Sequence, residues 1–242
     1  MGENGITAMP NIGDDDDIGG AANNNMAVTN AKQINTRGGE EGAGDQDGAQ
    51  SNIQRLIEDR LNDDPYVLFL DSLKMQNLGD LQKMTALQDL MKIDISKNYL
   101  DNIDALNDLV KLKVIIANNN YIRDVSLQLP KLQELDLGNN YIEKVPILSQ
   151  LPYLKILLLN ANKIRELKLQ CKHQNYTNIM KMNFRNNSIR FTNMEVINFV
   201  KKLKEFKSLR VLNMENNPFE KDGQINAKII RNLPQSLEMY NN

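Results

Sequence analysis

The chain has 242 residues, of which a quarter are charged, and its formal net charge at pH 7 is −2. This length allows one sizeable domain with a tail, and the near balance of charge argues against a protein that seeks nucleic acid through bulk charge. The apolar runs are far shorter than the roughly 20 residues of a membrane-spanning helix, and the single cysteine excludes an intrachain disulfide.

Residues 1–50 are poor in Leu, Phe and Tyr and carry a run of Asp at 14–17 and a run of Asn at 23–25. Such a segment cannot bury enough apolar surface to offset the entropy of ordering it, so we predict a disordered acidic tail rich in Asn and Gly. The Asp run lacks the alternate ligand spacing and the closing Glu of a calcium loop, which favours a solvated tail. We expect no secretory signal, because no apolar h-region is present, and Ile6 breaks the N-myristoylation motif.

Residues 51–89 are predicted to form an N-terminal cap. The segment begins with apolar residues at helical spacing, namely Ile53, Leu56, Ile57 and Leu61. Ser51 or Asn52 can cap the start of this helix, and Pro65 ends it. Residues 66–89 contain leucines at suitable intervals but no asparagine in register, which indicates a degenerate first repeat, as is common at the ends of repeat proteins.

Residues 90–217 contain six copies of one pattern, apolar-x-x-apolar-x-apolar-x-x-Asn-x-apolar. The asparagines follow one another at intervals of 22, 20, 22, 25 and 30 residues: Asn98, Asn120, Asn140, Asn162, Asn187 and Asn217. This is the leucine-rich repeat pattern, whose units stack because one unit cannot bury its apolar face alone. It predicts an α/β solenoid with a curved parallel sheet on the concave face, and short turns, 3₁₀ segments and late α-helices on the convex face.

The six asparagines are predicted to form a structural ladder. Each side-chain amide can bond to backbone groups of its own turn and of the neighbouring turn, and losing one rung costs about 1–3 kcal/mol.

The last repeat is long enough for a helix. Thr192 and Glu195 match a capping box, and apolar residues follow at Val196, Ile197, Phe199, Val200, Leu203 and Phe206. A shorter helix near 224–232, stopped by Pro234 and followed by Leu237 over the last strand, is expected within a C-terminal cap at 218–242.

The variable strand positions are predicted to bind a partner, since the core positions explain only the fold. Exposed apolar residues bordered by charge are typical of protein interfaces. The predicted set comprises the apolar Val114, Ile116, Ile156 and Leu158, the acidic Glu134 and Asp136 between them, and the basic Lys181 and Arg185. The alternative is that the alternation slips and these residues are partly buried.

Three tyrosines, Tyr99, Tyr121 and Tyr141, each follow a ladder asparagine and should form a row along one edge of the solenoid. Tyrosine is favoured at contacts because it offers area at a low entropy cost. Ordinary packing between adjacent repeats explains the row equally well, so the sequence leaves both readings open.

The sequence contains no recognisable catalytic motif. Cys171 and His173 could supply only two of the three or four protein ligands that a zinc ion needs. No phosphate-binding loop or dinucleotide fingerprint is present. A basic group at Lys201, Lys202, Lys204 and Lys207 fits a solvated helix face better than nucleic-acid binding. We therefore expect no enzymatic activity, no cofactor and no metal, and a protein partner with neither membrane nor nucleic acid bound directly.

The segments LMKIDISKNYLDNIDALNDLVKL, from Leu90, and LQELDLGNNYIEKVPILSQLPYL, from Leu132, resemble the 22-residue class of intracellular leucine-rich repeats, the SDS22-like family. The resemblance covers roughly residues 66–240. Members include protein phosphatase 1 regulatory subunits, axonemal dynein light chain 1, radial spoke proteins and nuclear spliceosomal or acidic leucine-rich proteins. The long last repeat, followed by LRVLNMENNPFEKD, looks most like the axonemal members.

This resemblance implies a non-enzymatic adaptor within a larger ciliary or axonemal assembly, associated with the radial spoke or with dynein. A phosphatase regulatory subunit and a nuclear ribonucleoprotein component are the alternatives. The late 25- and 30-residue repeats and the acidic tail depart from the phosphatase subgroup, whose repeats are uniform. The lone cysteine favours a reducing compartment, so we expect a cytoplasmic protein of the cilium or axoneme, with the nucleus as the alternative.

Overall fold

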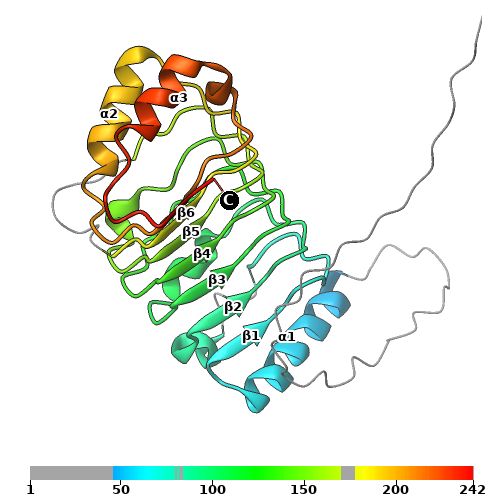
Figure 1. Cartoon of the computed structure of the whole chain (residues 1–242). Helices are drawn as coiled ribbons and strands as arrows, with labels where there is room; N and C mark the ends of the chain where they lie inside the picture. The colour runs from blue at the N-terminus through cyan, green and yellow to red at the C-terminus, as the bar shows by residue number, and fades with distance from the viewer. Residues whose placement is uncertain (1–45, 80, 82–83, 170–177, 242) are drawn as a thin grey trace, which may run out of the picture. The chain divides into compact units, whose positions relative to one another are not determined.

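The computed structural model describes residues 46–79, 81, 84–169 and 178–241 (Figure 1). All of them belong to one unit, residues 44–242. The tail predicted at 1–50 lies outside the described residues except for its last five positions. Cys171 and His173 also lie outside them, so the structure does not bear on a metal at that pair.

Eight short strands form one parallel sheet, and each strand pairs with its neighbours in sequence, giving the order β1-β2-β3-β4-β5-β6-β7-β8. The sheet is open, and the α/β solenoid predicted from the repeat pattern is confirmed. The strands are in phase, since Ile93 pairs with Ile115 and Ile115 with Leu135. Their bounds are β1 Val67–Phe69, β2 Lys92–Asp94, β3 Val114–Ile116, β4 Glu134–Asp136, β5 Ile156–Leu158, β6 Lys181–Asn183, β7 Val211–Asn213 and β8 Met239–Tyr240.

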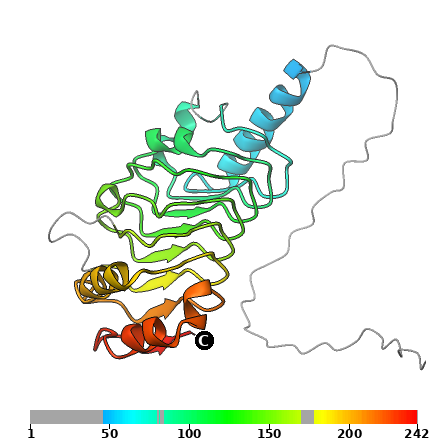
Figure 2. The same cartoon turned by 90° about the horizontal axis from the view of Figure 1, so that it is seen from above.

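Helical segments connect the strands and cover the ends of the sheet. α1 packs beside β1, whereas α2 and α3 pack together at the other end (Figures 1 and 2). The two 22-residue repeats contain the 3₁₀ segments η3 and η4, and the 20-residue repeat between them contains only a short turn at residues 130–131, as their lengths predicted. The bounds are α1 Gln46–Asp63, η2 Thr85–Asp89, η3 Asp104–Asp108, η4 Leu148–Gln150, α2 Asn193–Leu203, η5 Pro218–Lys221 and α3 Gly223–Ile230.

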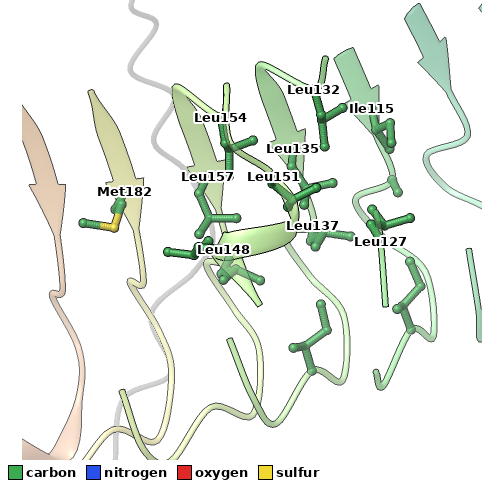
Figure 3. Close-up of a cluster of buried hydrophobic side chains, with 14 of the residues drawn as sticks. Ile115, Leu127, Leu132, Leu135, Leu137, Leu148, Leu151, Leu154, Leu157 and Met182 are labelled. Carbon is green, nitrogen blue, oxygen red and sulfur yellow. The ribbon is translucent and has the colours of Figure 1, made fainter. Parts of the chain in front are cut away.

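The core lies between the sheet and these connecting segments. The middle residue of each strand from β1 to β7 is buried, and it packs with the leucines of the connections. Figure 3 shows Leu148 and Leu151 of the η4 region beside Leu135 and Leu157 of the strands. Each buried aliphatic side chain contributes about 1.5–3 kcal/mol, so stacking of the repeats supplies most of the stability.

The N-terminal helix starts earlier than predicted. α1 begins at Gln46, which places Ser51 and Asn52 inside the helix, so the predicted N-cap at these residues is wrong. Composition suggested that residues 46–50 belong to the tail. Ala and Gln, which occur there, are nevertheless good helix formers, and no proline interrupts the run. The predicted end before Pro65 is confirmed, since the helix ends at Asp63.

The C-terminal part of the chain, from α2 onward, differs from prediction in three places. The short helix ends at Ile230, two residues before its predicted end and well before Pro234. Ile197, assigned to the apolar stripe of α2, is 37% exposed. Leu237 packs against the core as expected, but the chain then adds β8 at Met239–Tyr240, which pairs with β7. Two residues are too few to show a strand period, so sequence patterning could not reveal β8.

The capping box of α2 is confirmed and predicts a pH dependence. The Thr192 backbone N–H donates to the Glu195 carboxylate at 2.7 Å, and this bond holds the pKa of Glu195 below its usual value. The charged carboxylate therefore stabilises the fold above its ordinary pKa, and this contribution disappears as the pH falls through the lowered pKa. We expect Glu195→Gln to be slightly less stable than wild type at pH 7. Chemical denaturation across pH should show the two curves converging in acid; a gap independent of pH would contradict this assignment.

The residue before each ladder asparagine adopts a left-handed conformation, which yields a second stability prediction. Four of these six residues are asparagine, which tolerates this region well, and the other two are a lysine and an alanine. Ala161 holds this position before Asn162, in the fourth of the six copies, with φ of 53°. Ala161→Val should lower the free energy of unfolding by about 1–2 kcal/mol, because a β-branched side chain is strained there. Ala161→Asn should be at least as stable as wild type; equal urea midpoints for the Val and Asn variants would contradict this account.

Candidate interface on the open sheet face

The face of the sheet opposite the core, here called the open sheet face, is formed by the first and third residues of each strand. In β2 to β5 these residues are half-buried on either side of a fully buried middle residue. The strand period therefore does not slip. Val114, Ile116, Ile156 and Leu158 lie on the open sheet face, on the opposite side of the strands from the core.

Apolar and charged strands alternate across this face. β3 contributes Val114 and Ile116, and β5 contributes Ile156 and Leu158, while Glu134 and Asp136 of β4 lie between them in direct register. Two apolar stripes are thus separated by one acidic stripe. The structure thus brings together the four apolar residues and the two acidic residues that the sequence placed on this face.

The apolar residues at the third strand position are not required by the fold. In four strands this position holds Asp or Asn, whose side-chain oxygen accepts the backbone N–H two residues later at 2.9–3.0 Å: Asp94, Asp136, Asn183 and Asn213. Ile116 and Leu158 occupy the same position and cannot accept such a bond. The local turn favours Asp or Asn, so the two apolar residues forgo a stabilising contact where they face away from the core.

Phe69 of β1 belongs to the same face and was missed from the sequence. It is 47% exposed, and its Cα is in register with Asp94 of β2. The ammonium of Lys92 lies 5.4 Å from the centroid of its ring. Its strand lies in the degenerate repeat, where no asparagine marks the register, although alignment of Leu68 and Leu70 with Ile93 and Ile95 would have located it.

The two basic residues lie beyond β5, toward the C-terminal end of the sheet. Lys181 is exposed on β6, two strands from Glu134. Arg185 lies just beyond β6, and its guanidinium is 3.4 Å from the Glu215 carboxylate. This ion pair is exposed, so a partner can compete for Arg185 at little cost.

The ladder asparagines hold the turns that follow the strands. All six side chains are buried. Asn120 represents the arrangement: its Oδ1 accepts the Leu100 N–H at 3.0 Å, and its Nδ2 donates to the Ile95 carbonyl at 3.0 Å and the Ala117 carbonyl at 3.1 Å. The same contacts to the preceding repeat recur at Asn98, Asn140, Asn162, Asn187 and Asn217.

The tyrosines form a continuous stack on one edge. The ring centroids are 5.9 Å apart for Tyr99 and Tyr121 and 5.8 Å apart for Tyr121 and Tyr141, and Lys163 extends the row with its ammonium 6.0 Å from Tyr141. Each tyrosine stays 44–48% exposed. A shallow groove of about 440 Å³ runs along the row. The rings thus pack between repeats and also remain accessible to solvent.

Within the residues that the structure describes, no group of three or more His, Cys, Asp or Glu side chains is placed to hold a metal ion. Among the same residues, no helix has the length and apolar character needed to cross a membrane.

Comparison with known proteins finds similarity in structure alone. No protein-family model matches the chain, and no curated protein matches its sequence. Among solved structures, the LRIM1/APL1C complex aligns with a TM-score of 0.50 and 21% identity, covering 69% of this chain and 33% of that chain. An internalin from Listeria monocytogenes aligns with a TM-score of 0.44 and 17% identity over 69% and 51% of the two chains. A leucine-rich repeat protein of Leptospira interrogans gives 0.49 and 19% over the same shares.

The in-phase parallel sheet, the buried asparagines and the alignment at a TM-score of 0.50 together define the fold as a leucine-rich repeat solenoid. At these identities the likeness concerns the fold. The chain spans only about a third to a half of the length of these three structures.

Proposed function

We propose that this chain is a non-enzymatic scaffold that holds a protein partner on the open sheet face. The observation that carries the proposal is the placement of Ile116 and Leu158 at positions where the turn favours Asp or Asn. Apolar side chains on an exposed face, separated by the carboxylates of Glu134 and Asp136, match the composition of protein interfaces. Repeat solenoids commonly use such extended surfaces for binding.

The proposed setting is a ciliary or axonemal complex, in association with the radial spoke or with dynein. What supports it is the resemblance of the long last repeat and its LRVLNMENNPFEKD segment to axonemal members of the SDS22-like family. A regulatory subunit of a protein phosphatase is the second candidate. A component of a nuclear ribonucleoprotein is the third.

Affinity capture with the tagged full-length chain, followed by mass spectrometry, separates these settings. Recovery of radial spoke or dynein proteins is the expected result. Enrichment of a phosphatase catalytic subunit or of spliceosomal proteins would replace the ciliary setting with the corresponding alternative. Fluorescent tagging in ciliated cells adds an independent readout, because exclusion of the tagged chain from cilia would contradict the leading setting.

A further inference from the structure

We propose that the segment bound on the open sheet face is an amphipathic α-helix that crosses the strands, with apolar side chains seven residues apart and a Lys or Arg midway between them. This inference rests on the proposed function and specifies the chemistry of the partner.

The spacing of the apolar stripes matches a helix. Adjacent strands lie about 4.8 Å apart, so the stripes on β3 and β5 are separated by roughly 10 Å. Residues i and i+7 of an α-helix lie on one side of it and are about 10.5 Å apart. Two apolar side chains of the helix therefore contact Val114 with Ile116 and Ile156 with Leu158, one strand pair each.

The acidic stripe determines the charge of the helix residue that lies between the two apolar side chains of the helix. Glu134 and Asp136 lie on β4, halfway between the two apolar stripes. Residues i+3 and i+4 of the helix lie about 4.5–6 Å along its axis and face the same side, which places them over β4. A cation there pairs with two carboxylates in a partly desolvated setting, whereas an anion is repelled.

Other backbone conformations fit this face less well. Side chains on one side of an extended strand recur about every 6.7 Å, which does not match the separation of the stripes. A polyproline II segment repeats every 9.3 Å or so, close to that separation, but its two intermediate residues point about 120° away from the sheet. Only the helix supplies both apolar contacts and the cation between them.

The pattern continues toward both ends of the sheet. β1 adds a third apolar stripe with Val67 and the exposed Phe69, two strands before β3. Lys181 on β6 favours an acidic residue one strand beyond β5. The helix thus carries apolar residues at i−7, i and i+7, a basic residue at i+3 or i+4, and an acidic residue at i+10 or i+11.

A selection experiment on the full-length chain tests this pattern. The probes are three displayed libraries of randomised peptides about 22 residues long, the helix length that spans the sheet: one helical, one β-forming and one proline-rich. The test variant combines Glu134→Lys with Asp136→Asn. The Asn retains the oxygen that accepts the Gly138 N–H, as Asn183 and Asn213 do for their own turns, so the variant keeps this turn bond and loses only the contact between the second carboxylate oxygen and the Asn118 amide.

The wild-type chain is expected to enrich helical peptides with apolar residues seven apart and Lys or Arg between them. Those peptides should bind the Glu134→Lys, Asp136→Asn variant at least about tenfold more weakly, and that variant should instead enrich Glu or Asp at the central position. Enrichment of strand or proline-rich peptides, of helices without the central cation, or of no helix at all would overturn the inference.

A second variant distinguishes failure of the helix proposal from failure of the proposed function. Strand or proline-rich peptides that lose binding to an Ile116→Asp, Leu158→Asp variant would still dock on the open sheet face, so the scaffold would survive and only the helix would be wrong. Peptides of any class that bind this variant as well as wild type would contradict both.

Discussion

Replacement of Asn120 by leucine is expected to lower the free energy of unfolding by about 3 kcal/mol. The leucine removes an acceptor from the Leu100 N–H and a donor from the carbonyls of Ile95 and Ala117, and all three groups lie in the buried turn. A buried polar group left unpaired costs about 1–3 kcal/mol, and more than one is left here. Urea denaturation monitored by circular dichroism measures the change.

The matched control is Asn198→Leu, which makes the same chemical change at an exposed position of α2. Surface substitutions away from special features usually change stability by less than about 0.5 kcal/mol. A drop for Asn120→Leu alone supports the asparagine ladder. Equal midpoints for wild type and Asn120→Leu would show that the ladder does not stabilise the solenoid.

Loss of partner capture is expected when Ile116 and Leu158 are both replaced by aspartate. The change puts two further anions beside Glu134 and Asp136 and removes the apolar contact from both stripes. Because aspartate can restore the turn bond that Asp94 and Asp136 make at this position, folding should remain cooperative. Capture by the tagged variant, compared with wild type at equal amounts of folded chain, gives the result.

The matched control carries the same charge change outside the strands, at Val110→Asp with Ile147→Asp. These residues are 47% and 43% exposed and lie in the segments that lead to β3 and β5. The control variant should retain capture. If instead the Ile116→Asp, Leu158→Asp variant unfolds while the control stays folded, the two positions belong to the core and the interface is misplaced.

The sequence predicts the sheet well because one repeating unit specifies it many times. The spacing of Leu132, Leu135 and Leu137 to Asn140 sets the strand, the turn and the direction of every side chain in a unit, and neighbouring units repeat that spacing. The first and third strand positions could therefore be assigned to the open sheet face before any coordinates. Elements that occur once, such as the start of α1 and the two-residue β8, have no such repetition and were misplaced or missed.

The strand positions of the candidate interface residues follow from the sequence, whereas their contacts do not. Hydrophobicity and charge identified Val114, Ile116 and Leu158. These two properties do not predict that Asp136 also accepts hydrogen bonds from two groups of its own chain. Its Oδ1 accepts the Gly138 N–H at 3.0 Å, and its Oδ2 accepts from the Asn118 amide at 2.7 Å. The first contact lies within one turn and the second joins adjacent repeats, and both depend on side-chain conformations that a linear pattern does not specify.

Site-specific photo-crosslinking tests most directly whether the open sheet face holds the partner. A benzoyl-phenylalanine in place of Leu158 puts an apolar, reactive group in the β5 stripe, and the same residue in place of Val110 puts one on an exposed segment away from the strands. On irradiation with the captured proteins, position 158 should form a covalent adduct with the partner and position 110 should not. Crosslinking at position 110 with none at position 158 would place the partner elsewhere and contradict the docking surface derived from the alternating strands.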